Sequence, residues 1–323
     1  TARAGGPGRS RRCRPLMPAA AGVSSRPSAW RWLAATRPAF LSLTLLGWLI
    51  GVAASHPPAA LRGGLLLALL GAVLLHALAN VVNDVADDAN GGDAVNTGRV
   101  FPFTGGSRLI QDGVLSARAM TGLAVALGVV LLGLGGLLLW WRGWPVAVLG
   151  GAGFLVAWGY SAPPLALNRR GLGEPAVALA FALVPWGTAW LVAWPSEPLG
   201  LAALAYALAV AAVLYVNQFP DREADLACGK RHWVARWTPQ QAARRFGFLL
   251  AGLYAVAALV VPAADGPLWL LPVLLLPLVL HATAWRMLLR DAVQPVRLAP
   301  AIRFNLLAVH GVALWLAGAL YGF

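Results

Sequence analysis

The stretch that decides the fold is GLLLALLGAVLLHALANVVNDVADDANGGD, residues 64–93, in which an apolar run leads into an acidic end. A second stretch has the same order: LAALAYALAVAAVLYVNQFPDREADLACGK, residues 201–230. Each run ends in an Asn followed by Asp residues at four-residue spacing, which places them on one face of a helix. Charged side chains are costly at membrane depth, so carboxylates found there usually serve a function. The two stretches therefore predict two apolar helices that each end in a functional acidic face.

The rest of the chain is as apolar as these two runs. Hydrophobic residues make up 59% of the 323 residues and charged residues only 11%, whereas soluble domains carry about a quarter charged residues. Apolar runs of about 20 residues are candidate membrane spans. We expect nine of them, at residues 39–55, 61–82, 117–140, 144–160, 175–194, 199–219, 246–264, 267–287 and 301–322. This predicts an all-α membrane protein of about nine transmembrane helices, in the lipid bilayer.

Basic residues indicate the orientation of these helices. If the N-terminus is cytoplasmic, 23 of the 25 Lys and Arg residues fall on the cytoplasmic side, and only Arg62 and Arg142 fall outside. Lys and Arg are enriched in cytoplasmic loops. We therefore expect a multi-pass protein of the cell (inner) membrane, with its N-terminus and the loops 84–116 and 220–245 in the cytoplasm.

The net charge of +13 is explained by this orientation and by contact with anionic lipid, so no nucleic-acid partner is predicted. Residues 1–28 form a basic lead rich in Gly, Pro and Arg that we expect to be disordered, and Met17 could be the true start. Residues 29–323 form the membrane domain. Cys13 and Cys228 both fall on the cytoplasmic side, where thiols stay reduced.

The two acidic segments suit one kind of chemistry. Meeting at a membrane surface, they would form an oxygen-rich site for Mg²⁺, and through it for a diphosphate. Neutral carbonyl ligands, or side chains that fix the carboxylates, would come from Asn80, Asn83 and Asn217. Basic residues that follow each segment would neutralise phosphate oxygens: Arg99, Arg108, Lys230, Arg231 and Arg236. Ionising a lipid-linked diphosphate leaves an allylic cation, which the aromatic faces of Tyr160 and Phe103 could shelter.

Other readings of the same residues stay open. We interpret His76 as a core histidine rather than a ligand, and Glu174 as a helix cap acting through the helix dipole. A cation-coupled transporter could also use Asp residues near broken helices. It would be expected to place them near the membrane midplane, whereas both acidic segments here lie at cytoplasmic helix ends.

At these residues the chain resembles the UbiA superfamily of intramembrane prenyltransferases, from about residue 37 to the C-terminus. Within it the chain is most similar to the 1,4-dihydroxy-2-naphthoate polyprenyltransferases of menaquinone synthesis. The matching strings are NDVADDANGGD (83–93), PFTGGS (102–107), YSAPP (160–164), RGLGE (170–174), PDREAD (220–225) and GKR (229–231).

The resemblance implies a helical bundle around a central cavity, capped by the two long loops. It implies Mg²⁺-dependent transfer of a polyprenyl group from a polyprenyl diphosphate to an aromatic acceptor. The motifs align on Asn83, Asp84 and Asp87 and on Asn217, Asp221 and Asp225. This makes four carboxylates the catalytic residues and metal ligands (Asp84, Asp87, Asp221 and Asp225) and leaves Asp88 off the metal face.

Departures from the superfamily patterns bear on the acceptor. Many relatives carry a further Asp where this chain has Gly91, and we count Asp93, two residues later, among the substrate-binding candidates. The Arg-Thr-x-x-Arg-Pro pattern typical of 4-hydroxybenzoate enzymes is replaced by PFTGGS, and a Tyr-xxx-Lys pattern fails at Pro164. The resemblance therefore favours 1,4-dihydroxy-2-naphthoate as the acceptor, with 4-hydroxybenzoate or another quinone or lipid precursor as the alternative.

Overall fold

A computed structural model describes residues 28–322, and within that range the chain is helical without strands. The basic lead, except for Ser28, lies outside the described residues. The elements are α1 (Ala29–Ala35), α2 (Pro38–Ser55), α3 (Ala59–Asn90), α4 (Gly92–Val95), α5 (Ala117–Arg142), α6 (Trp144–Ser161), η1 (Leu167–Arg169), α7 (Gly173–Trp190), α8 (Glu197–Ala227), η2 (Val234–Arg236), α9 (Pro239–Ala263), α10 (Leu270–Val273), α11 (Leu275–Asp291), η3 (Pro295–Leu298) and α12 (Ala299–Tyr321).

All nine expected spans fall on helices. In the described part of the chain, seven helical segments are long and apolar enough to cross a membrane, including α10 with α11 and η3 with α12. The other two expected spans correspond to α6 and α7, each of 18 residues. Their apolar residues are diluted by Gly, Trp and Pro, and α7 also carries Glu174. The all-helical prediction is confirmed, while the count of nine spans stays a prediction.

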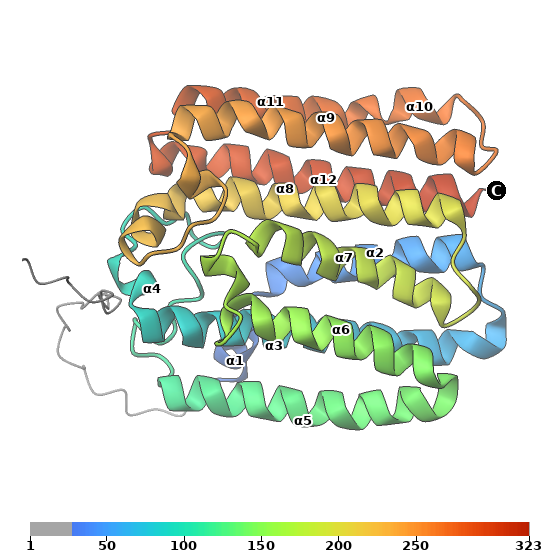
Figure 1. Cartoon of the computed structure of the whole chain (residues 1–323), viewed down its shortest axis with the longest axis horizontal. Coiled ribbons are helices and arrows are strands. Elements are labelled where there is room, and N and C mark those ends of the chain that lie inside the picture. Colours follow the sequence, from blue (N-terminus) through green and yellow to red (C-terminus); the bar gives the residue numbers. More distant parts are fainter. Residues whose placement is uncertain (1–27, 323) are drawn as a thin grey trace, which may run out of the picture.

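The long helices lie side by side with their axes roughly parallel (Figure 1). The loops after α3, α6, α8 and α11 all lie at one end of the bundle, and the C-terminus lies at the other (Figure 1). We call the first of these the loop end. The alternation of helix directions is the one that the sequence predicts, because it gathers both acidic segments at the same end.

The two acidic helices are longer than a membrane is thick. At 1.5 Å per residue, the 32 residues of α3 span about 48 Å, whereas the hydrocarbon core of a bilayer is about 30 Å thick. The 31 residues of α8 make a helix of nearly equal length. Each helix therefore extends beyond the apolar layer by several turns, and its acidic segment occupies that extension.

Local signals in the sequence fix where these helices begin and end. Helix α3 ends at Gly91, whose φ of 82° is the left-handed conformation that glycine adopts readily. Helix α5 begins after Ser116, whose hydroxyl accepts a hydrogen bond from the Ala119 amide. Helix α9 begins with a capping box formed by Thr238 and Gln241. These boundaries set the lengths of the loops 91–116 and 228–238.

The core of the bundle surrounds α8. In its most apolar window, 72% of the residues of α8 are buried, against 11% for α5. Helix α8 packs against α7, α9 and α12, whereas α5 packs against α3 and α6 at the edge of the bundle. The outer surface of α5 is therefore left to face lipid.

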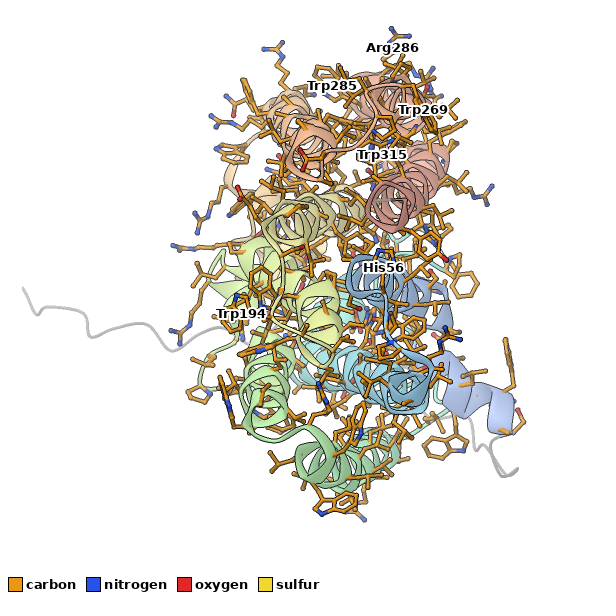
Figure 2. All side chains as sticks on the ribbon, turned by 90° about the vertical axis from the view of Figure 1, so that its right-hand side faces the viewer. His56, Trp194, Trp269, Trp285, Arg286 and Trp315 are labelled. Carbon is orange, nitrogen blue, oxygen red and sulfur yellow. The ribbon has the colours of Figure 1, made fainter. Side chains whose placement is uncertain are left out.

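Tryptophans gather at the end opposite the loops, which faces the viewer in Figure 2. Trp194 and Trp269 are 74% and 67% exposed there. The rings of Trp144, Trp190 and Trp194 form two edge-to-face pairs with centroids 5.2 and 5.3 Å apart. Tryptophan is enriched at membrane–water interfaces, so this cluster suits the level of the lipid headgroups.

Candidate active site

One cavity of about 870 Å³ opens among α2, α3, α5, α6, α7 and α8, with its polar mouth at the loop end. Its volume falls in the range of small-molecule sites. Residues of both long loops line the mouth, including Asn96, Phe103, Gly106 and Lys230, and apolar residues line the deeper part. The cavity therefore joins the two acidic segments to a long apolar chamber.

Asp84 does not itself line the cavity and is held just behind the mouth by an ion pair. Its carboxylate pairs with the guanidinium of Arg37, just before α2, and accepts a hydrogen bond of 3.2 Å from the amide of Ser107 in the first loop. Arg37 also donates to the side-chain oxygen of Asn83 at 3.0 Å. The first acidic segment is thus joined to α2 and to the PFTGGS stretch.

Lys230 joins the two acidic segments to each other. Its ammonium lies 3.0 Å from Asp87 on α3 and 2.9 Å from Asp225 on α8. Burial alone would lower the pKa of Lys230, but the two carboxylates raise it well above its ordinary value. A single charged amine therefore bridges residues that lie more than 130 positions apart in the chain.

Asp221 is held by the first loop. Its two carboxylate oxygens accept hydrogen bonds from the side chain of Asn96 at 2.7 Å and from the amide of Gly105 at 3.1 Å. The side chain of Asn217, one helical turn earlier, donates to the carbonyl of Phe103 at 3.5 Å. Loop 91–116 thus reaches across the mouth and binds the acidic face of α8.

Several buried oxygen atoms at the mouth have no hydrogen-bond partner. They include Asp93 Oδ2, Asn96 Oδ1 and Asn217 Oδ1. Burial, together with the negative charges of Asp87 and Asp84, raises the pKa of Asp93 to about 8. A β-carbon added at Gly106 would lie 2.6 Å from Asp93 and 3.1 Å from Asp84. The mouth thus keeps unpaired hard oxygen donors, and Asp93 packs against a backbone position that only glycine can occupy.

This donor set fits Mg²⁺, which prefers carboxylate and carbonyl oxygens. In residues 28–322, no three His, Cys, Asp or Glu side chains are already grouped closely enough to hold a metal ion. Asp84, Asp87 and Asp225 form ion pairs with the side chains of Arg37 and Lys230. The four-carboxylate metal set is therefore a prediction that the oxygen donors support.

The asparagine and aromatic candidates from the sequence analysis all line the cavity. Asn80, Asn83 and Asn217 line the cavity, and Tyr160 and Phe103 line it as well. Asn80 also donates to the carbonyl of Thr36 at 2.9 Å, which fastens α3 to the segment before α2.

None of the four predicted phosphate-binding arginines, Arg99, Arg108, Arg231 and Arg236, lines the cavity. Arg99 lies over the ring of Phe101, 5.8 Å from its centroid. Arg108 donates to the carbonyl of Asp93 at 2.7 Å. Arg231 accepts a hydrogen bond of 3.0 Å from Arg236 through its carbonyl. In this arrangement their contacts brace the loops.

Two residues at the mouth are not among the sequence candidates for phosphate or metal contact. Arg37 precedes α2 and faces Asp84, and His232 follows Lys230 with its Nε2 atom 3.2 Å from Asp225. His232 Nδ1 accepts the Ala235 amide hydrogen, so Nε2 carries the ring proton of a neutral imidazole. His232 follows Lys230 by only two residues, so its place beside the second acidic segment is predictable from the sequence. Arg37 lies 47 residues from Asp84, and local spacing could not reveal it.

Three further polar residues named in the sequence analysis lie in or near the site. Asp88 accepts a hydrogen bond of 3.2 Å from Gln111 and does not line the cavity, so it points away from the mouth. His76 lines the cavity, where its Nδ1 lies 2.8 Å from the hydroxyl of Thr44. Glu174 is buried at the start of α7 and accepts a 2.7 Å hydrogen bond from the Trp233 amide, which fastens the second loop to α7.

Known proteins with similar sequences are prenyltransferases. Residues 40–309 match the model of the UbiA prenyltransferase family. A 1,4-dihydroxy-2-naphthoate octaprenyltransferase of Escherichia coli is 31% identical over 88% of this chain and 95% of its own length. A 2-carboxy-1,4-naphthoquinone phytyltransferase of Synechocystis is 26% identical over 78% of this chain and 80% of its own.

The fold also matches solved structures. A UbiA homologue from Archaeoglobus fulgidus, bound to DMAPP and Mg²⁺, covers 90% of this chain and 98% of its own, with a TM-score of 0.60 and 15% identity. The family model covers most of the chain, from α2 into α12, and it includes both acidic segments. The chain is therefore a prenyltransferase that belongs to the UbiA family.

Proposed function

We propose that this enzyme transfers a polyprenyl group from a polyprenyl diphosphate to 1,4-dihydroxy-2-naphthoate, with Mg²⁺ as cofactor. The observation that carries the proposal is the joining of two acidic segments, through Lys230, at the mouth of a long apolar cavity. A diphosphate with an isoprenoid tail has the matching division into an anionic head and an apolar chain.

The donor's head would bind at the loop end. The oxygen atoms of Asp84, Asp87, Asp93, Asp221 and Asp225 would hold Mg²⁺, which neutralises the diphosphate as a leaving group. Lys230 and Arg37 line the same mouth and would contact phosphate oxygens. The two loops cover the head and limit the access of water.

The bond between the first carbon of the prenyl chain and the diphosphate oxygen then breaks, and the diphosphate leaves with the electron pair. The resulting allylic cation lies below the carboxylates, where Tyr160 and Phe103 line the cavity. Their ring faces stabilise a cation. A carbon of the acceptor's aromatic ring supplies the electron pair for a new bond to the cation, and the ring regains its aromaticity when that carbon loses the proton, or the carboxylate as CO₂, that it carried.

Two features support a bicyclic acceptor. Both naphthoate-type relatives match most of this chain. In addition, Phe103 lines the mouth and offers a flat ring surface against which a bicyclic acceptor can stack. Stacking on Phe103 would add about 0.5–1.5 kcal/mol beyond the burial of area.

A competition assay tests both parts of this proposal. Purified membranes with octaprenyl diphosphate, Mg²⁺ and equal amounts of 1,4-dihydroxy-2-naphthoate and 4-hydroxybenzoate should release pyrophosphate and yield mainly the naphthoate product by mass spectrometry. Chelation by EDTA should stop the release, and added Mg²⁺ should restore it. A preference for 4-hydroxybenzoate would overturn the acceptor, and release unaffected by EDTA would overturn the metal requirement.

We also propose that the loop end faces the cytoplasm. The loops at this end and the adjoining helix ends carry most of the basic residues, whereas Arg62 and Arg142 lie near the opposite helix ends, and such a bias marks the cytoplasmic side. In a bacterial host, a C-terminal alkaline phosphatase fusion should therefore be active and a C-terminal GFP fusion dark. The reverse pattern would reject this orientation or the nine-span count.

A further inference from the structure

Five glycines form part of the cavity wall on α5 and α6. These are Gly128, Gly135 and Gly136 on α5 and Gly150 and Gly151 on α6, and we call them the glycine wall. A β-carbon built on any of the five would have no atom within 4 Å. No protein atom occupies the space beside them, and Gly136, Gly150 and Gly151 are exposed.

Glycines in membrane helices usually let neighbouring helices approach closely, and other glycines of this chain do so. A β-carbon at Gly51 would meet the side chain of Thr188 at 2.6 Å, and one at Gly153 would meet Leu75 at 3.0 Å. The glycine wall has no such neighbour. Helix packing therefore does not explain why these five positions carry no side chain.

The wall runs along the length of the cavity. Gly128 and Gly135 are seven residues apart on α5, which is about 10 Å along the helix axis. Gly150 lies ten residues before Tyr160 on α6, about 15 Å from the mouth. The open space thus continues from the level of the proposed reaction toward the opposite end of the bundle.

Leu138 marks the far end of this space. It lines the main cavity and also a second pocket of about 200 Å³, which Trp141 and Gly64 line from the other side. The aromatic ring of Trp141 lies against Gly64. Leu138 therefore separates the apolar chamber from further empty space between α3 and α5.

Polar side chains at the mouth of the cavity indicate what kind of ligand fills the chamber. Two side chains there are more than nine-tenths buried, line the cavity and keep an unpartnered oxygen: Asp93 Oδ2 and Asn96 Oδ1. A ligand bound at the mouth that also fills the chamber must carry a polar head and a long apolar tail.

We propose that the glycine wall and Leu138 set the length of isoprenoid tail that the enzyme accepts. This inference rests on the proposed prenyl transfer and deepens it. Side chains at the wall would occupy the space of the distal tail, whereas removal of the Leu138 side chain would open the second pocket to it. The absence of side chains at the wall makes long-chain polyprenyl diphosphates the substrate class.

Leucine substitutions test the wall. Gly135→Leu and Gly150→Leu should each lower the ratio of kcat/KM for octaprenyl diphosphate to that for farnesyl diphosphate by about tenfold or more, because a blocked pocket discriminates by at least this much. Farnesyl transfer should continue, which shows that the variants fold. Leu138→Ala should raise the same ratio.

Gly133→Leu is the matched control. Gly133 lies on the same helix as Gly135, is exposed as Gly150 is, and has no atom within 4 Å of its β-carbon position, but it does not line the cavity. It should leave the ratio unchanged. Unchanged ratios in both wall variants, with both donors still used, would overturn the role of the wall. If the wild-type enzyme transferred neither donor, the proposed function would fail instead.

Photolabelling adds a readout that needs no turnover. An octaprenyl diphosphate that carries a diazirine at the distal end of its tail should label α5 and α6 peptides in the wild-type enzyme, as mapped by mass spectrometry. The Gly150→Leu variant should lose this labelling. Equal labelling in that variant would contradict the proposal.

Discussion

Replacement of Asp87 or Asp221 by Asn should lower kcat by about a hundredfold or more at saturating Mg²⁺, because loss of one charge that stabilises a transition state commonly costs this much. The substitution keeps the size of the side chain and removes its charge. Asp87 is paired with Lys230, and Asp221 accepts hydrogen bonds from Asn96 and Gly105. The two variants thus test each acidic segment separately.

Asp88→Asn is the matched control for these variants. Asp88 directly follows Asp87, yet it binds Gln111 and does not line the cavity. Its kcat should stay near the wild-type value, and all three variants should elute as folded protein in detergent. Wild-type kcat in both Asp87→Asn and Asp221→Asn would reject the assignment of the acidic segments to catalysis.

Lys230→Gln should be nearly as damaging, with a loss of about a hundredfold in kcat/KM for the donor. Glutamine keeps polar atoms at the site but carries no charge. The variant would lose the ammonium between Asp87 and Asp225 and the contact proposed for phosphate. Because ground-state binding and departure of the diphosphate both involve this charge, KM should rise and kcat should fall.

Arg231→Gln provides the comparison, since Arg231 is adjacent, exposed and absent from the cavity wall. Its kinetic constants should change by less than about threefold, since exposed charges contribute little. Equal losses in the two variants would show that general loop charge, rather than the bridging amine, is what the enzyme requires.

The sequence predicts the membrane helices from patterns within single helices, and it predicts the meeting of the two acidic segments from the number of helices between them. Apolar runs set helix length, and four-residue spacing sets the face that a carboxylate occupies. The side on which each loop lies follows from the number of helix crossings. These inferences need no knowledge of how the helices pack.

Which basic residues pair with the acidic side chains depends on how the helices and loops pack, so the sequence predicts it less well. Arg99 and Arg108 follow the first acidic segment in sequence, but loop geometry turns their side chains toward Phe101 and the carbonyl of Asp93, and Arg231 after the second segment is exposed. Arg37 reaches Asp84 because α2 and α3 lie against each other. Spacing along one chain segment cannot show contacts that depend on where another helix lies.

The pairing of acidic side chains with Arg37 and Lys230 has a consequence for how the protein is made. A newly inserted chain must fold before it has met metal or donor, and a lone buried charge would then cost several kcal/mol. Asp84, Asp87 and Asp225 each have an internal counter-charge instead. These counter-charges therefore spare the folding chain the cost of a lone buried charge at each of the three carboxylates.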